Sequence, residues 1–365
     1  MASAGPAAHR TRVQVISPER TPGLQRPASV PRSFTGRRLH TPYLKTPQSR
    51  ILHGRRSRLT RTPSSAHPTN QRFSKLTNKT WHTYYVSPLY AFSNEAASLK
   101  RCSRQLSSHL QAESQKGVGV MVEDQVTSKY AVFSLRPELF PDSDVPAVEL
   151  SIYASKSQAI SASSPPAWTS IFCPPSSPVM GDDKHFSRLP LMLIKGAIGT
   201  TNCVLQWLQV QFDCCVRKLT FNPMALSWMV SMWAESLPDK KKNSDGDKKC
   251  GVELVYHLPK EISGLNKVTM TIDSRDARAL WESVHEEDSD EVEEDEVVSF
   301  MKALGQHFHA CFHIHLDALY LKTIGTAAAF VGAEGRLKML SLGEASGVLQ
   351  HLVELAEEKM ASLDV

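Results

Sequence analysis

The chain has 365 residues, a length that gives room for two domains and their buried cores. Its formal charge of +5 hides an asymmetry: residues 1–80 carry sixteen Lys or Arg against the single acid Glu19, a net of +15, which leaves −10 for the remainder. The chain therefore combines a basic arm with an acidic body. Its start has no hydrophobic stretch of the kind that secretory signals contain, so we do not expect a secreted precursor.

The cysteines and the N-terminal composition bear on the cellular compartment. Seven cysteines include no CxxC pair, and Cys214 and Cys215 are adjacent, which favours reduced thiols in a cytosolic or nuclear protein. The Arg- and Ser-rich start, poor in acids, also resembles a mitochondrial transit peptide, although prolines interrupt the amphipathic helix that such a peptide needs. Both locations stay open at this point.

Residues 1–78, the basic arm, are predicted to be disordered, because nine prolines and few apolar residues cannot offset the entropy of ordering. Its arginine clusters predict contacts with DNA phosphates or a nuclear import signal, and a solvated tail is the alternative. The candidate phosphate-binding residues are Arg37, Arg38, Arg55, Arg56, Arg58 and Arg61. Five residues that precede proline are candidate phosphorylation sites, which would reduce the positive charge of the arm: Ser17, Thr21, Thr41, Thr46 and Thr62.

An N-terminal α+β domain is predicted over residues 79–238. Helices are placed by apolar residues three or four apart and strands by alternation or short apolar runs. In chain order we expect an opening strand and turn over Trp81–Phe92, a helix from Ser93 or Asn94 to Lys116, a hairpin of Val118–Gln125 and Lys129–Leu135, a strand over Ala147–Ser155, strand fragments within Ser161–Asp183, a strand over Leu191–Ile194 and a helix over Thr200–Phe212.

The stretch Phe221–Trp233 predicts the central helix of the fold. Asn222 can cap its start and Pro223 suits its first turn. Its apolar residues occupy every side of the helix, so we expect it to be buried all round. At about half of the ~20 residues that a membrane span needs, it is too short to cross a bilayer.

A second α+β domain is predicted over residues 250–365, after the polar loop Asp239–Lys249. The acidic run Glu286–Glu296 is predicted to be a self-repelling loop, and the alternative is a dock for a basic partner or for the chain's own arm. The expected strands are Val252–Leu258, Lys267–Ile272, His313–Leu321, Gly325–Val331 and Arg336–Ser341. The expected helices begin at Asp273 or Ser274, either of which can cap the start, at Val297, and at Glu344, where Val348, Leu352 and Leu355 form the buried stripe.

The richest group of reactive residues lies in Gln306–His315, with four histidines and Cys311. The spacing argues against zinc, because His307 and His309 would point to different sides of a helix and His313 and His315 supply no second pair in register. The chain also lacks GxGxxG, GxxxxGK[ST], GxSxG and HExxH motifs. We therefore expect no metal, no cofactor and no enzymatic activity; the alternative is a mitochondrial or cytosolic enzyme without a recognisable motif.

A binding role fits these features better. The last strands and the final helix predict an α+β end whose sheet leaves an edge open to a partner strand. From this edge argument the candidate partner-binding residues are Ile314, Leu316, Leu319, Tyr320, Phe330, Leu337 and Leu340.

Several blocks of the body resemble the centromere protein L (CENP-L) family of the inner kinetochore, in matching order and spacing. They are Trp81–Phe92, Ala112–Gly117, Leu226–Met229 with Met232 and Trp233, Asp276–Trp281 with Ser283–His285, His307–His309 with Ile314–Leu316, and Gly347–Leu349 leading into Leu352 and Glu354–Ala356. The basic arm has no counterpart that can be aligned.

The resemblance implies an α+β protein of the nucleus and the centromere, without enzymatic activity. It implies an obligate partner, CENP-N, joined through the C-terminal region by extending a sheet between two chains. It further implies association with CENP-C, with other inner-kinetochore subunits and with chromatin built on the CENP-A nucleosome. No membrane and no small-molecule substrate are expected. The family pattern assigns no partner contact to an individual residue.

Overall fold

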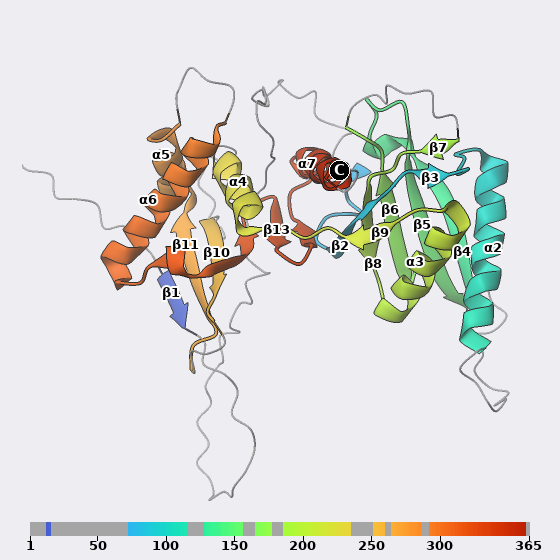
Figure 1. Ribbon diagram of the computed structural model, residues 1–365, viewed down its shortest axis with the longest axis horizontal. Coiled ribbons are helices and arrows are strands. Elements are labelled where there is room, and N and C mark those ends of the chain that lie inside the picture. The colour runs from blue at the N-terminus through green and yellow to red at the C-terminus, as the bar shows by residue number, and fades with distance from the viewer. Residues whose placement is uncertain are drawn as a thin grey trace, which may run out of the picture. The chain divides into compact units, whose positions relative to one another are not determined.

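The computed structural model describes the backbone of residues 12–15 and the full residues of 72–115, 128–154, 165–176, 185–233, 251–259, 264–285 and 292–362 (Figure 1). Its helices and antiparallel sheets confirm the predicted α+β class. The chain folds into two compact units. Unit 1 contains residues 222–333 with the first strand, and unit 2 contains residues 61–221 and 334–365.

The two units divide the chain differently from the predicted ranges 79–238 and 250–365. The central helix α4 (Pro223–Ala234) belongs to unit 1, because it packs against α5, α6 and β12. The last strand and helix return to unit 2, because β14 (Arg336–Met339) pairs with β2 (Thr80–Val86). Unit 2 is thus completed by a C-terminal segment that is distant in the sequence from the rest of the unit.

Unit 2 is built on an antiparallel sheet in the order β14-β2-β8-β6-β5-β4, with β9 also paired to β2. The remaining strands of this sheet are β4 (Ser128–Arg136), β5 (Ala147–Ser155), β6 (Trp168–Cys173), β8 (Leu191–Lys195) and β9 (Val216–Lys218). A separate two-stranded ribbon joins β3 (Leu89–Tyr90) to β7 (Phe186–Ser187), and the short helix η2 (Pro137–Leu139) follows β4.

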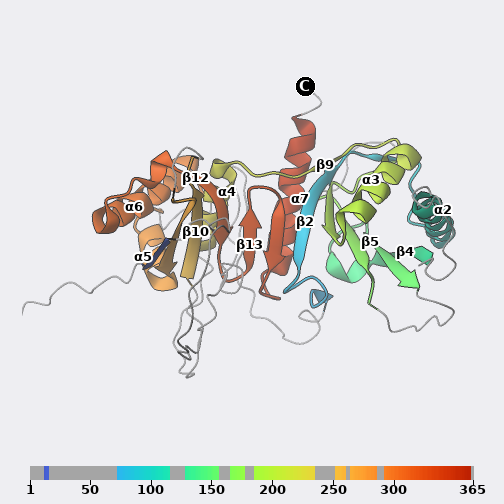
Figure 2. The ribbon, with the colours of Figure 1, turned by 90° about the horizontal axis from the view of Figure 1, so that it is seen from below.

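Helices cover both faces of the sheet in unit 2. α2 (Ala96–Gln115) and α3 (Ile198–Phe212) share a core with Met192 and Ile194 of β8. Leu191 and Leu193 point to the other face, where α7 (Ala345–Ala361) packs against β2 and β8 (Figure 2). Because β8 is buried on both faces, both sets of its alternating side chains are apolar. This explains the continuous apolar run in its sequence.

Unit 1 has antiparallel strands in the order β1-β11-β10-β12-β13. Its strands are β1 (Arg12–Val15), β10 (Gly251–His257), β11 (Lys267–Asp273), β12 (Tyr320–Gly325) and β13 (Ala329–Gly332). Its helices are α4, α5 (Ser274–Glu282), α6 (Glu294–Phe312) and the 3-10 turn η3 (Leu316–Ala318). The aromatic core includes Trp233, Trp281, Phe300 and Phe308, each at most 1% exposed.

The two predicted N-caps are confirmed. Asn222 Oδ1 accepts a hydrogen bond from the backbone N–H of Ala225 at 2.7 Å, and Asp273 Oδ1 accepts one from Arg275 N at 3.1 Å. The expectation that α4 is buried all round is wrong on one side. Leu226, Met229 and Trp233 are buried, whereas Met224, Trp228 and Met232 are only half-buried.

The predicted strand His313–Leu321 is wrong over most of its length. α6 continues to Phe312, and His313, with a φ of 54°, ends the helix by donating its N–H to His309 O at 2.8 Å. η3 follows, and the strand begins only at Tyr320. The alternating apolar residues from Ile314 mimic a strand, but two of them, Leu316 and Ala318, lie in the 3-10 turn instead.

Other boundaries also differ from the predictions. The expected strand Gly325–Val331 is the end of β12 and the start of β13, because Thr326 N donates to Ala329 O and closes a turn between them. The expected hairpin partner Val118–Gln125 lies outside the described residues, and β4 pairs with β5. Residues 72–78 belong to the body, since Phe73 and Leu76 are each 1% exposed.

Candidate functional site

The seven predicted partner residues are divided between the two units and differ in burial. Ile314, Leu316, Leu319, Tyr320 and Phe330 belong to unit 1, and Leu337 and Leu340 belong to unit 2. Leu316, Phe330 and Leu337 are buried in the cores, at 2%, 1% and 0% exposure, and Tyr320, at 50%, is the most exposed. The remaining three are half-buried. Among these residues Tyr320 offers a partner the largest side-chain surface.

The strand that carries Tyr320 has no open edge. β12 pairs with β10 on one side and with β13 on the other. Addition of a partner strand directly to β12 would therefore require one of these neighbours to leave. An incoming strand needs an outer strand of a sheet, and β4 in unit 2 and β11 in unit 1 are the strands to consider.

The outer edge of β4 is closed by side chains of α2, which runs alongside it (Figure 1). Ser107 Oγ accepts a hydrogen bond from Ala131 N at 2.9 Å, and Ser103 Oγ accepts one from Phe133 N at 3.0 Å. Both hydroxyls also donate within the helix, to Ser103 O and Leu99 O. The donors that a partner strand would pair with are therefore already satisfied at these two positions.

The outer edge of β11 is closed by another strand. β1 pairs with it in antiparallel register, from Arg12 opposite Thr271 to Val15 opposite Val268. The sequence predictions placed these residues in a disordered arm, because the short run R-V-Q-V is surrounded by prolines and basic residues.

A cluster of basic side chains gathers on one face of the sheet in unit 2. Arg336 of β14 lies opposite His82 of β2, and Lys218 of β9 lies opposite Tyr84, two residues further along β2. Because alternate strand residues share a face, all three basic groups point the same way. Lys218 and Arg336 are exposed and His82 is half-buried. We call His82, Lys218 and Arg336 the basic cluster.

The positive charges of Lys218 and Arg336 act on the imidazole of His82. Burial, and then the positive charges of Lys218 and Arg336, lower the pKa of His82, so the imidazole is disfavoured as a third cation. An anion bound there would reduce the repulsion, and phosphate is an anion that Arg and Lys commonly bind in proteins. This cluster could not be predicted from the sequence, because its members come from three distant segments and none of them lies in a run of charged residues.

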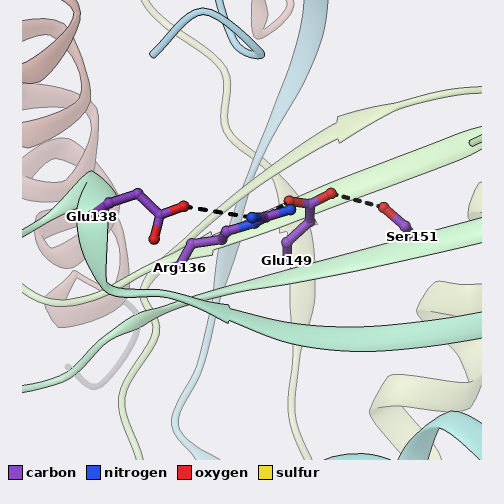
Figure 3. A network of polar contacts seen from close by, with 4 residues as sticks. All are labelled: Arg136, Glu138, Glu149 and Ser151. Carbon is purple, nitrogen blue, oxygen red and sulfur yellow. Dashed lines mark hydrogen bonds and ion pairs between the residues drawn. The ribbon is translucent and has the colours of Figure 1, made fainter. Parts of the chain in front are cut away.

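A second polar group lies where the end of β4 pairs with the start of β5, and its side chains bond to one another (Figure 3). Arg136 Nε donates to Glu149 Oε2, Arg136 Nη1 lies 3.5 Å from Glu138 Oε1, and Ser151 Oγ donates to Glu149 Oε1 at 2.9 Å. Burial alone would lower the pKa of Arg136, but the bonds to Glu149 and Glu138 outweigh it and raise the pKa. A permanently charged, fully engaged arginine stabilises the strand pair rather than supplying an acid or a base.

The histidine-rich segment is arranged differently from the prediction. His309 lies in the last turn of α6, and the ring of His315 stacks on it with centroids 4.1 Å apart, while the centroid of the His313 ring lies 5.8 Å from that of His309. His313 and His315 thus lie in the turn after α6 rather than on one strand face. No group of three or more His, Cys, Asp or Glu side chains in the described part of the chain has a geometry that could hold a metal ion.

The described cysteines do not supply an activated nucleophile at the buried positions. Burial raises the pKa of Cys173, and burial followed by the charges of Cys215 and Asp213 raises the pKa of Cys214 to about 12. Both thiols therefore stay protonated at neutral pH. No disulfide joins cysteines within the described residues. Nor does any helix there have the length and apolar character needed to cross a membrane.

The remaining predicted sites lie outside the described residues. These are the arginines Arg37, Arg38, Arg55, Arg56, Arg58 and Arg61 and the phosphorylation candidates Ser17, Thr21, Thr41, Thr46 and Thr62.

Comparison with known proteins places the body of this chain in one family. A sequence model described as "CENP-L: Centromere protein L" matches residues 75–357. Centromere protein L of Gallus gallus is 37% identical over 298 residues, which cover 78% of this chain and 81% of that protein. The proteins of the same name from Bos taurus and Homo sapiens are 35% and 34% identical over 294 residues each, covering 78% of this chain and 80% and 81% of theirs.

Proposed function

The chain belongs to the centromere protein L family, and from this premise we propose that it is a non-enzymatic scaffold subunit of the inner kinetochore. In this role it acts in the nucleus, at the centromere, and helps to link CENP-A chromatin to the kinetochore during chromosome segregation. The observation that carries the proposal is the extent of the family match, which begins before β2, ends within α7 and so includes both units.

The basic cluster supports a contact with DNA. His82, Lys218 and Arg336 present two exposed cations and a titratable ring on one sheet face. Such a group neutralises phosphates without reading the base sequence, which suits a subunit that holds chromatin in place. We assign the arginines of the arm, from Arg37 to Arg61, to the same role, as an additional basic tether.

Pairing with CENP-N is the second part of the proposal, with CENP-C and other inner-kinetochore subunits as further partners. We assign the CENP-N contact to the C-terminal part of the chain, residues 250–365. The exposed Tyr320 supports this, because an aromatic ring half in solvent is typical of interface anchors. The closed edges of β12 mean that its side chains, rather than its backbone, are available to a partner.

The location of the protein tests the proposal as a whole. A fluorescently tagged full chain should give paired nuclear dots on mitotic chromosomes, in register with centromeric chromatin. A reticular signal would instead favour the alternative, a mitochondrial enzyme. A diffuse signal outside the nucleus would favour a cytosolic one.

The DNA contact is tested through its salt dependence. In the full chain, Lys218→Ala with Arg336→Ala should weaken binding to duplex DNA and reduce the slope of log K against log salt by about 2, since each lost phosphate contact contributes about 0.9. Lys100→Ala with Arg104→Ala is the matched control, because it removes two exposed cations from α2. Equal slopes for both variants would remove the basic cluster from the interface.

The partner contact is tested by co-expression with CENP-N. Tyr320→Ala should reduce recovery of a soluble complex, whereas Tyr90→Ala, at 49% exposure in unit 2, should leave it unchanged. The same loss with both variants would argue against a specific role for Tyr320.

We propose that phosphorylation of the basic arm weakens its binding to DNA. Each phosphate adds about −1.5 to −2 charge, so modification of Ser17, Thr21, Thr41, Thr46 and Thr62 would offset a large part of the +15. Replacement of all five by glutamate should lower chromatin retention, and retention equal to that of the alanine variants would contradict the proposal.

A further inference from the structure

The helix α3 of unit 2 exposes a face without charged residues. Its sequence, I-G-T-T-N-C-V-L-Q-W-L-Q-V-Q-F, contains no Asp, Glu, Lys or Arg. The inner side of α3 packs in the core through Trp207 and Leu208, where the helix lies over the sheet (Figure 1). By contrast, the exposed sides of α2, α6 and α7 carry charges, among them Lys100, Lys302 and Lys359. A depletion of charge is typical of the centre of a protein interface.

The two most exposed large apolar side chains of the described residues stand at the two ends of this face. Ile198, in the first turn of α3, is 77% exposed, and Val210, in the last turn, is 82% exposed, whereas no other large apolar side chain described exceeds 50%. With the exposed residues between them they lie within an arc of about 120° around the helix. We call these six residues the neutral face: Ile198, Gly199, Asn202, Gln206, Gln209 and Val210.

The neutral face has nearly the same order of side chains from either end. Ile198 and Val210 each stand six residues from Val204, and Asn202 and Gln206 each stand two residues from it. An antiparallel pair of α3 helices, with a two-fold axis at the level of Val204, therefore places Ile198 opposite Val210 and Asn202 opposite Gln206. A side-chain amide both donates and accepts hydrogen bonds, so these two amides are complementary to each other. The face thus complements a second copy of itself.

The ends of α3 are complementary in the same arrangement. The N-cap residue Ala197 offers the N–H groups of the first turn no side-chain acceptor, and the N-terminus of a helix carries a partial positive charge. Asp213, which is exposed and follows the C-terminus of α3, lies beside the N-terminus of the other helix in the antiparallel pair and offsets that charge. Gly199 falls opposite Gln209, and no atom lies within 4 Å of the position that a Cβ of Gly199 would take, which leaves room for the longer side chain.

We propose that the neutral face of α3 pairs with the same face of a second copy of this chain, antiparallel and about a two-fold axis. The fifteen residues of α3 span about 22 Å, and a single helix pair of that length belongs with the weak interfaces below ~1,200 Å². The pair therefore forms where several copies are held close together. The inference goes beyond the proposed function, because α3 contains none of the predicted partner residues and the pairing needs neither CENP-N nor DNA.

The test uses two full-length variants with opposite charges on the neutral face. Asn202→Lys with Gln206→Lys makes lysines face each other across the pair, and Asn202→Glu with Gln206→Glu does the same with glutamates. Sedimentation velocity should show a dimer of the unaltered chain that grows with concentration. Each variant alone should dimerise at least about tenfold more weakly, because facing like charges repel. An equimolar mixture of the two variants should regain the dimer, since each lysine then faces a glutamate.

Gln105→Lys with Gln111→Lys is the matched control, because it converts two exposed amides of α2, and it should dimerise like the unaltered chain. Circular dichroism checks that all variants keep their helices. The proposal is overturned by an unaltered chain that stays monomeric at every concentration, by a dimer that the charged variants leave unchanged or the control weakens equally, or by a mixture that stays monomeric. Because the assay contains neither CENP-N nor DNA, its failure leaves the proposed function in place.

Discussion

The outer edges of strands β4 and β11 are both covered, but by different kinds of group. β4 is closed by Ser103 and Ser107, two hydroxyls on a neighbouring helix that accept hydrogen bonds from its backbone. β11 is closed by the backbone of Arg12–Val15, a segment far away in the sequence. A side-chain closure is part of the packed body and excludes another strand, whereas a backbone closure presents the geometry that another strand would use. The first edge is therefore closed by side chains of the same unit, and the second by a strand that is distant in the sequence.

The largest expected effect comes from loosening α2, the helix that seals β4. Leu106, at 0% exposure, anchors α2 in the core with Phe133 and Trp207. Leu106→Ala should lower the free energy of unfolding by about 2–5 kcal/mol, through lost burial and the cavity left behind. Urea unfolding of unit 2, followed by tryptophan fluorescence, measures this. The exposed neighbour Gln105→Ala should change the free energy by less than about 0.5 kcal/mol, and a similar loss for both would contradict the anchoring role.

A smaller effect is expected when the seal itself is removed. Ser103→Ala with Ser107→Ala leaves the part-buried N–H groups of Phe133 and Ala131 without their acceptors, and each lost hydrogen bond should cost about 0.5–1.5 kcal/mol. Hydrogen exchange at these two amides should accelerate, and the free energy of unfolding should fall. Ser108→Ala, on the exposed side of the same helix, is the control. Unchanged hydrogen exchange at the two amides would mean that the serine hydroxyls do not close the edge of β4.

Acid provides a test of unit 2 that does not involve strand edges. The pKa of His82 is lowered in the folded chain, so the unfolded chain, with an ordinary pKa of about 6.5, binds protons first as the pH falls. The stability that neutral His82 contributes is complete above pH 6.5 and is lost as the pH falls towards the lowered value. Unfolding at pH 7.5 and 5.5 should therefore show a smaller acid-induced loss in His82→Gln than in the unaltered chain. An equal loss would remove His82 as the cause.

The smallest effect on stability is expected at Tyr320. Its side chain is 50% exposed, so Tyr320→Ala should change the free energy of unfolding by less than about 0.5 kcal/mol. Leu316→Asp, four residues earlier, places a charge at a site that is 2% exposed and should unfold unit 1. Thermal unfolding of the two variants separates a surface role from a core role. Equal destabilisation would show that the ring of Tyr320 is needed for folding.

Features that depend on neighbouring residues could be predicted from the sequence. The caps at Asn222 and Asp273, the apolar run of β8 and the stripe of α7 are all local, and the structure has them close to the predicted positions. The prediction failed between His313 and Tyr320, where apolar alternation is typical of a strand but the chain forms the 3-10 turn η3. The turn forms because His313 closes α6 through His309 O and Leu319 N then donates to Leu316 O.

The sequence by itself determined the α+β class, the opposite charges of arm and body, and the family to which the body belongs. Only the tertiary structure decided that His82, Lys218 and Arg336 share a face, that serines of α2 seal β4, and that residues 12–15 pair with β11. These features join segments that are far apart in the chain. Their free energy comes from pairing and packing between those segments, and such interactions leave no periodic signal in the local sequence.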